Sequence, residues 1–243
     1  MVSKNQKKLI KSLAFKKYRK QHGLFIAEGV KLINELLQQE LQVQAIYTIN
    51  PALFSQVTAT VVTVTEQELQ SLSFLKKSQQ ALALFYAPEY NLQKQPEVLL
   101  TLDDVQDPGN LGTLIRLCDW FGIKDVVCSL HTVDAYNPKV VQATMGSIGR
   151  VRVFYKELSG FFQTLSEDTE VYGTFMEGTS IYKTRFQKPS VFILGNEGKG
   201  ISDTVSKWVT QRITIPKYDR NNQVESLNVA TAGAILLNEF RRQ

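Results

Sequence analysis

The sequence predicts an α/β protein whose larger, C-terminal part is built on a mostly parallel sheet. Short apolar runs that suit buried strands alternate with helix-period segments along both halves of the chain. In the second half, the number of strands and helices is typical of a sheet covered by helices on both faces. A polar segment bounded by prolines, residues 88–97, separates the two halves.

Composition limits the class of protein. The chain has 243 residues, of which 43% are hydrophobic and 21% charged, so it can bury an ordinary core in one large domain or two modest ones. It has no apolar run that could span a bilayer and no signal-peptide pattern. Cys118 and Cys128 are too few for a disulfide framework, and two histidines at no ligand spacing predict no metal site. We therefore expect a cytoplasmic protein with neither a metal nor a membrane partner.

The first 22 residues are strongly basic. No acidic residue precedes Glu28, and Leu9, Leu13 and Phe15 form a thin apolar stripe. The pattern predicts a basic helix followed by a basic turn. Such charge runs are often only solvated faces, but this excess favours contact with the phosphate backbone of a nucleic acid. The cations are Lys4, Lys7, Lys8, Lys11, Lys16, Lys17, Arg19 and Lys20.

The remainder of the first half predicts a small α/β domain. Thr65 and Glu68 form a capping-box pair at the start of one helix. Strands are expected at residues 25–27, 45–49, 60–64 and 81–86, and helices at 30–41 and 65–73. We place this domain at residues 1–90, a linker at 91–97 and a larger domain at 98–243.

The second half continues the alternation. Pro138 suits the first turn of its helix, because a helix needs no backbone N–H bond there. Strands are expected at 98–102, 125–129, 152–155, 171–175, 191–194 and 212–215. Helices are expected at 111–121, 138–145, 157–165, 202–209 and 226–240.

A polar turn follows the strand at 98–102. Pro108-Gly109 breaks the chain, Asn110 is suited to cap the next helix, and Arg116 falls on the side of that helix away from its apolar residues. Because ligands bind at the carboxyl ends of strands in an open α/β sheet, this turn is a candidate site. On this stretch alone, a well-capped surface helix with a solvated arginine is an equal alternative.

A glycine-rich turn follows the strand at 191–194. Gly195, Gly198 and Gly200 allow close backbone approach, but the spacing fits neither a phosphate-binding P-loop nor a dinucleotide fingerprint. Glu197 would also repel a phosphate, so the turn better suits a neutral or cationic ligand. Further on, Pro216 ends a strand, and Ser226 or Asn228 can cap the last helix.

Residues 105–116, 194–201 and 215–228 resemble, in order and spacing, the signature motifs of the SpoU family of RNA ribose 2′-O-methyltransferases, the TrmH-like branch of the SPOUT superfamily. The sequence contains Gln-Asp-Pro-Gly-Asn-x-Gly-x-x-x-Arg, Leu-Gly-Asn-Glu-Gly-x-Gly and Ser-Leu-Asn-Val. The likeness covers roughly the last 150 residues. Residues 1 to about 90 resemble the accessory RNA-binding domain of that family, which is similar to ribosomal proteins.

The resemblance implies a trefoil-knotted fold, a homodimer formed through the C-terminal domain, ribosomal or transfer RNA as substrate, and S-adenosylmethionine as methyl donor. It assigns catalysis to Asn110, Arg116, Glu197, Ser226 and Asn228. It assigns the donor pocket to Thr174, Leu194, Gly195, Asn196, Gly198, Ile215, Ser226 and Leu227. The expected RNA contacts are Lys7, Lys8, Lys11, Lys16, Lys17, Arg19, Lys20 and Arg116.

Four alternatives concern the donor pocket, the role of Arg116 and the function. The loop at 217–225 is longer than the family's and lacks glycine, so the donor pocket can differ in shape. Arg116 could act as a base or as a phosphate clamp; we favour the clamp, because a guanidinium stays protonated in proteins. A non-catalytic RNA-binding protein of the same fold is the alternative function, which the intact motif residues disfavour. A dehydrogenase is disfavoured by the failed glycine patterns.

Overall fold

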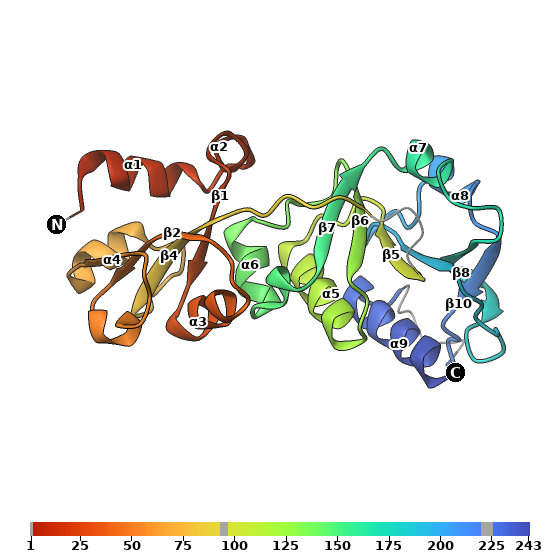
Figure 1. The fold of residues 1–243 in the computed structure, drawn as a ribbon. Coiled ribbons are helices and arrows are strands. Elements are labelled where there is room, and N and C mark those ends of the chain that lie inside the picture. The colour runs from red at the N-terminus through yellow and green to blue at the C-terminus, as the bar shows by residue number, and fades with distance from the viewer. Residues whose placement is uncertain (1, 93–96, 220–225) are drawn as a thin grey trace. The chain divides into compact units, whose positions relative to one another are not determined.

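The computed structural model describes residues 2–92, 97–219 and 226–243 (Figure 1). These residues form two compact units, one made of Met1–Glu89 and Asp134–Arg150, the other of Tyr90–Val133 and Val151–Gln243. The segment 134–150 belongs to the first unit, whereas the division expected from the sequence assigned it to the larger domain. Part of the expected linker, residues 93–96, lies outside the described residues.

The first unit contains a four-stranded mixed sheet in the order β1-β4-β2-β3. β4 pairs antiparallel with β1 and β2, and β2 pairs parallel with β3. The Thr65–Glu68 capping box is confirmed at the start of α4. The elements are α1 (Lys4–Ser12), α2 (Lys16–His22), β1 (Leu24–Glu28), α3 (Val30–Gln38), β2 (Val43–Thr48), η1 (Pro51–Phe54), β3 (Thr60–Thr63), α4 (Glu66–Leu72), β4 (Ala81–Tyr86), α6 (Pro138–Thr144) and η2 (Ser147–Gly149).

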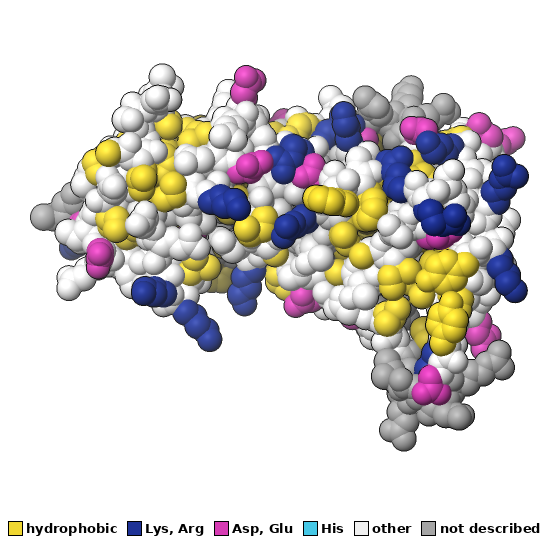
Figure 2. Space-filling view, turned by 90° about the horizontal axis from the view of Figure 1, so that it is seen from below, with side chains coloured by type: hydrophobic (Ala, Val, Ile, Leu, Met, Phe, Trp, Pro, Cys, Tyr) yellow, Lys and Arg dark blue, Asp and Glu magenta, His cyan; other side chains and the backbone are white. Residues whose placement is uncertain are grey.

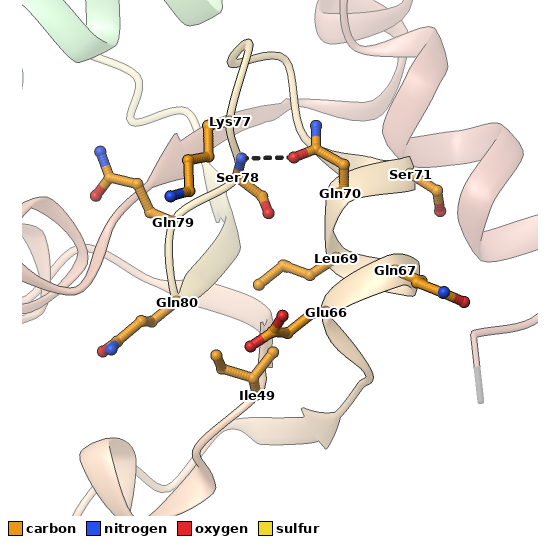
Figure 3. Close-up of a pocket in the computed structure, with 10 residues that line it drawn as sticks. All are labelled: Ile49, Glu66, Gln67, Leu69, Gln70, Ser71, Lys77, Ser78, Gln79 and Gln80. Carbon is orange, nitrogen blue, oxygen red and sulfur yellow. Dashed lines mark hydrogen bonds between the residues drawn. The ribbon is translucent and has the colours of Figure 1, made fainter.

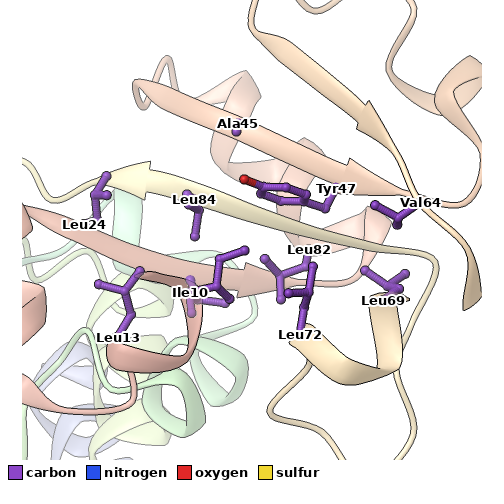
Figure 4. Packing of buried hydrophobic residues seen from close by; sticks show 11 residues of the cluster. Ile10, Leu13, Leu24, Ala45, Tyr47, Val64, Leu69, Leu72, Leu82 and Leu84 are labelled. Atoms are coloured by element: carbon purple, nitrogen blue, oxygen red, sulfur yellow. The ribbon is translucent and has the colours of Figure 1, made fainter. Parts of the chain in front are cut away.

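An apolar cluster fixes α1 on the first unit. Ile10 and Leu13 are fully buried and belong to one core cluster with Leu24 of β1 and Leu84 of β4 (Figure 4). Burial of apolar side chains on one side of a short helix leaves its polar side in water. Phe15, which we expected in the apolar stripe, is instead 64% exposed. We also expected a basic turn after the first helix, but the structure has a second helix there, α2.

The second unit contains a six-stranded sheet in the order β10-β8-β9-β5-β6-β7. All five neighbouring pairs are parallel, which confirms the predicted parallel sheet. The elements are β5 (Val98–Leu102), α5 (Pro108–Trp120), β6 (Asp125–Ser129), β7 (Arg152–Lys156), α7 (Leu158–Phe162), β8 (Glu170–Ser180), β9 (Ser190–Leu194), α8 (Asp203–Ser206), β10 (Gln211–Thr214) and α9 (Val229–Arg242).

Helices cover the sheet of the second unit. Figure 1 shows α5 and α9 on one side of the strands and α7 and α8 on the other. A Cβ atom at Gly233 would lie 2.6 Å from Leu114 Cδ2, so α9 approaches α5 closely at this glycine. Within the described ranges, no helix is long and apolar enough to cross a membrane.

A hollow on the first unit lies between α4 and residues 77–80 (Figure 3). The Gln70 Oε1 atom accepts a hydrogen bond of 2.8 Å from the Ser78 N–H and closes one side of it. Glu66 and Lys77 place opposite charges on its lining, and Ile49 and Leu69 contribute apolar surface. None of the residues predicted to bind RNA or donor lines this hollow.

Glu28 is a buried carboxyl group at the end of β1. It accepts hydrogen bonds from the Ser73 hydroxyl and, at 2.8 Å, from the Phe74 N–H. Burial nevertheless raises the pKa of Glu28 above its ordinary value, because desolvation disfavours the charged form more than these bonds favour it.

We predict that Glu28 makes the free energy of unfolding fall as pH rises from the ordinary glutamate pKa through the raised folded-state value. Below this window the folded state retains a proton that stabilises it, and above the window this contribution is lost. Urea unfolding of wild type and Glu28→Gln between about pH 4 and 8 measures the effect. The stability of wild type relative to the glutamine variant should decline with pH, and a constant difference would contradict the assignment.

Candidate active site

Parallel pairing of β5 and β9 brings the first two signature segments to one edge of the sheet. Leu102 and Leu194, the last residues of these strands, are partners in the register. Just beyond them, the Asp103 N–H donates to the Leu194 carbonyl at 2.9 Å. The buried Asp103 carboxylate then accepts from the Ser202 N–H at 2.8 Å. The turns that follow the two strands are therefore fastened to each other.

The glycine-rich turn is held by the Asn196 side chain. Its Oδ1 atom accepts from the Gly198 and Lys199 N–H groups at 2.9 and 3.0 Å, and its Nδ2 atom donates to the Asp104 carbonyl at 2.8 Å. A Cβ atom at Gly195 would lie only 2.2 Å from the Gly200 carbonyl carbon, so this close crossing requires glycine. The Asn196 side chain thus shapes the turn through hydrogen bonds within the chain.

The first turn of α5 differs from our expectation. The helix begins at Pro108, and its N-cap is Asp107, whose Oδ1 atom accepts from the Asn110 N–H at 2.8 Å. Asn110 therefore lies inside the first turn and does not cap the helix. Because Asp107 caps the helix, the amide side chain of Asn110 is available for other contacts. Pro108 favours the first helical position, so the sequence Asp107-Pro108 could have indicated that Asp107 is the cap.

One chain of hydrogen bonds joins all three signature segments. Asn110 Nδ2 donates to Glu197 Oε1 at 2.9 Å, and Asn228 Nδ2 donates to Asn110 Oδ1 at 2.9 Å. Asn228 also caps α9, because its Oδ1 atom accepts from the Ala230 N–H at 2.9 Å. Each amide thus donates on one side and accepts on the other, so the geometry fixes the orientation of both asparagines and of the Glu197 carboxylate.

Arg116 lies on the exposed side of α5. Among the residues that the structure describes, its guanidinium has no hydrogen-bond or ion-pair partner, so it can meet an anionic group from solvent. Cys118 lies on the buried side of the same helix. Burial raises the pKa of the Cys118 thiol, so this thiol is a core group and not a nucleophile.

The expected donor-pocket residues come from β8, from the end of β9 and from the segments that follow β9 and β10. Thr174 is half-buried on β8, and its hydroxyl donates to the Ile193 carbonyl of β9 at 3.0 Å. Ile215 follows β10 and is half-buried, whereas Ser226 and Leu227 are exposed just before the Asn228 cap. Most of the unusual loop, residues 220–225, lies outside the described residues.

The chemistry of these groups fits S-adenosylmethionine. Backbone amides and the apolar side chains of Ile215 and Leu227 suit an adenosyl group, and the exposed Glu197 carboxylate suits a positively charged sulfonium. Across the described ranges, no cluster of three His, Cys, Asp or Glu side chains could hold a metal ion.

The predicted RNA contacts of the first unit divide by exposure. Lys7, Lys8, Lys17 and Lys20 are exposed, and Lys16 is half-buried. Lys11 and Arg19 instead bind oxygen atoms within the first unit.

The Lys11 ammonium donates to the Ser73 carbonyl at 2.9 Å, and burial lowers the pKa of Lys11. Arg19 is only 5% exposed, and its Nε atom donates to Asp134 Oδ2 at 2.7 Å. Arg19 therefore does not fit the RNA contact that we expected.

Comparisons with known proteins agree with this geometry. The profile of the SpoU rRNA Methylase family matches residues 97–238, and that of the MRM3-like substrate binding domain matches residues 4–83. The chain is 34% identical to the 23S rRNA (guanosine(2553)-2'-O)-methyltransferase RlmP of Bacillus subtilis, over 98% of this chain and 97% of the relative.

Solved structures resemble the whole chain. A putative RNA methyltransferase of the TrmH family from Porphyromonas gingivalis matches with a TM-score of 0.89 and 37% identity, covering 100% of this chain and 99% of the other. An AdoMet-bound rRNA methyltransferase from Sinorhizobium meliloti matches with a TM-score of 0.86 and 26% identity, covering 100% and 97%. With its three signature segments joined in one site, the chain belongs to the SpoU rRNA methylase family.

Proposed function

We propose that this protein transfers a methyl group from S-adenosylmethionine to a ribose 2′-hydroxyl of RNA. The observation that carries the proposal is the hydrogen-bonded chain from Asn228 through Asn110 to Glu197, which assembles the three signature segments. A non-catalytic protein would have no need to keep these exposed polar groups in one arrangement. Relatives named as rRNA 2′-O-methyltransferases, together with the AdoMet-bound neighbour, support the same reaction.

Arg116 acts as a clamp on an RNA phosphate. Its guanidinium is exposed two turns after the start of α5, and it can form a bidentate contact that orients the adjacent ribose. The same positive charge stabilises the developing alkoxide at the 2′-oxygen. A guanidinium stays protonated in proteins, so Arg116 assists loss of the proton electrostatically and does not accept it. Solvent water takes the proton, the methyl group forms its new bond to the 2′-oxygen, and S-adenosylhomocysteine is left as the second product.

Glu197 and the glycine-rich turn serve the donor. When bound, S-adenosylmethionine supplies a methyl group already activated on a sulfonium. The Glu197 carboxylate, held by Asn110, attracts that positive charge, and the backbone near Gly195 and Leu227 orients the ligand. We propose Leu194 at the end of β9, Asn196 and Gly198 in the turn, and Thr174, Ile215 and Ser226 as the remaining donor contacts.

Ribosomal RNA is the substrate class that we propose. The full-length relative from Bacillus subtilis is named for 23S rRNA, and the first unit matches a substrate-binding profile. We also propose a cytoplasmic location, as expected from the sequence. The proposed phosphate contacts of the first unit are Lys7, Lys8, Lys17 and Lys20. The likeness of the first unit to ribosomal proteins stays a prediction.

We also propose a homodimer formed through the second unit. Trp120, at the end of α5, is 84% exposed, and Ile235 of α9 is only half-buried. Figure 2 views the molecule from the side on which α5 and α9 lie and shows hydrophobic side chains exposed among Lys and Arg side chains. A second copy could cover such a face. Family membership supports a trefoil knot in this unit, which also stays a proposal.

We predict that Arg116→Ala lowers the rate of methyl transfer to ribosomal RNA by at least about 10²-fold, because it removes the charge that stabilises the transition state. Transfer of labelled methyl groups measures this rate. The rise in melting temperature with S-adenosylhomocysteine should match that of wild type, because the donor site is intact.

Lys124→Ala, which removes another exposed cation of the second unit, is the matched control. Normal transfer by Arg116→Ala would contradict the clamp. Wild-type protein that neither binds S-adenosylhomocysteine nor transfers methyl groups would contradict the proposed reaction and favour a non-catalytic RNA-binding protein.

We predict that Asn110→Ala lowers kcat by about 10- to 100-fold, because Glu197 and Asn228 lose the amide that fixes them and small displacements of reacting groups are costly. Thr113→Ala changes an exposed residue one turn further along α5 and should retain wild-type kcat. Steady-state kinetics on ribosomal RNA compare the two variants, and equal kcat values would show that the hydrogen-bonded chain does not position the site.

We predict that wild-type protein sediments as a dimer and that Trp120→Glu weakens the dimer by more than about tenfold, since a charge would be buried at the interface. Sedimentation equilibrium over a range of concentrations measures the dissociation constant. Tyr182→Glu, at another exposed aromatic residue of the second unit, is the control. A monomeric wild type would exclude the proposed interface.

A further inference from the structure

Two aromatic side chains are exposed within the basic N-terminal segment. Phe15, the N-cap of α2, is 64% exposed, and Tyr18, in the first turn of that helix, is 38% exposed. Their ring centroids are 6.4 Å apart with an interplanar angle of 72°. A single exposed aromatic side chain is common on protein surfaces, but two neighbouring rings amid lysines call for a physical reason.

The backbone that carries the two rings is held rigidly. The buried Arg19 guanidinium donates to the Leu13 and Ala14 carbonyls at 2.7 and 2.9 Å and to Asp134 Oδ2 at 2.7 Å. Within the turn, the Tyr18 N–H donates to the Phe15 carbonyl at 3.1 Å. Because Leu13 is also fixed in the core of the unit, the rings stand on an ordered base and lose little freedom on binding.

Every charged side chain in the first 27 residues is positive. Lys17 and Lys20 are exposed on α2, Lys7 and Lys8 are exposed on α1, and no acidic residue precedes Glu28. The Lys17 ammonium lies 5.9 Å from the centroid of the Tyr18 ring. A polyanion is thus the complementary partner of this surface.

Aromatic rings on a rigid base beside lysines match the chemistry of unpaired RNA. Rings stack on exposed nucleobases, which duplex RNA hides in its helical stack, and lysines neutralise the neighbouring phosphates. An acidic protein would satisfy the lysines but gives no reason for two exposed rings within one helical turn of each other.

We propose that Phe15 and Tyr18 form a stacking platform for unpaired nucleobases of the RNA substrate, with Lys17 and Lys20 on the adjoining phosphates. This inference rests on the proposed RNA methyltransferase function and adds a preference for a single-stranded stretch, such as a loop or bulge. It assigns to the aromatic residues a role that charge alone cannot provide.

The first experiment compares binding of a short unstructured RNA with binding of the same RNA paired to its complement. Phe15→Ala and Tyr18→Ala should each weaken binding of the single strand by about 5- to 150-fold, the range measured for base stacking on aromatic side chains, and leave duplex binding nearly unchanged. Equal losses on both RNAs, or no loss on either, would overturn the platform.

Salt dependence separates stacking from charge. Lys17→Ala and Lys20→Ala should each reduce the slope of log K against log salt by about 0.7, because each removes one phosphate contact. Phe15→Ala and Tyr18→Ala should weaken binding without changing that slope. A reduced slope in the aromatic variants would mean that they disturb the lysines, and the proposal would fail.

Two substitutions at Phe15 test the ring itself. Phe15→Tyr keeps an aromatic face and should bind single-stranded RNA as wild type does, whereas Phe15→Leu keeps apolar bulk and should bind as weakly as Phe15→Ala. Tyr182→Ala removes an exposed ring of the second unit and serves as the control. Phe15→Leu with wild-type affinity would overturn stacking as the source of binding.

Methyl transfer distinguishes failure of this inference from failure of the proposed function. On ribosomal RNA, Phe15→Ala should raise KM and leave kcat unchanged, because the platform binds substrate away from the reacting atoms. If wild type methylates ribosomal RNA and the variant has the same KM, only the platform is wrong. If wild type has no activity and binds no RNA, both proposals are wrong.

Discussion

The parallel pairing of β5 with β9 is the constraint on which the site depends. Because Leu102 and Leu194 are partners at the ends of these strands, the chain leaves the sheet twice at the same edge. Asp103 and Asp104 then fasten the glycine-rich turn, one through its carboxylate and the other through its carbonyl group. Carboxyl ends of parallel strands meet in this way in open α/β sheets, and their loops commonly bind ligands.

Hydrogen bonds at this edge position groups more than they stabilise the fold. Asn110, Glu197 and Asn228 are accessible to solvent, where an exchanged hydrogen bond contributes about 1 kcal/mol or less. These hydrogen bonds orient the side chains, because each amide can bind both of its neighbours in only one orientation. The site therefore holds a carboxylate in place while Arg116, on the same helix as Asn110, stays exposed to a ligand from solvent.

Burial divides the basic residues of the first unit into structural and exposed groups. The apolar side of α1 packs in the core, so Lys7 and Lys8 are exposed to solvent. Lys11 is half-buried and donates a hydrogen bond to the Ser73 carbonyl. Arg19 is enclosed because five donors in one planar group can satisfy carbonyl and carboxylate oxygens together. The cation that orders the turn is thus the one least able to reach RNA.

Local patterns in the sequence determined the elements and the family of this protein. The strands at Val98–Leu102 and Asp125–Ser129 have the predicted bounds, because a strand buried on both faces is a continuous apolar run between polar residues. The capping box at Thr65 is likewise complete within four residues. The three signature motifs identified the family because their residue types and spacing are specific.

Only the tertiary structure decided what individual side chains contact. Asn110 pairs with Glu197 and Asn228, and Arg19 with Asp134, across 87 to 118 residues of sequence. No local pattern contains these partners, which meet because strand pairing and core packing bring distant segments together. Phe15 likewise fits an apolar stripe by spacing, yet it is exposed, because α1 ends at Ser12 and Phe15 lies in the turn before α2, outside the helical period.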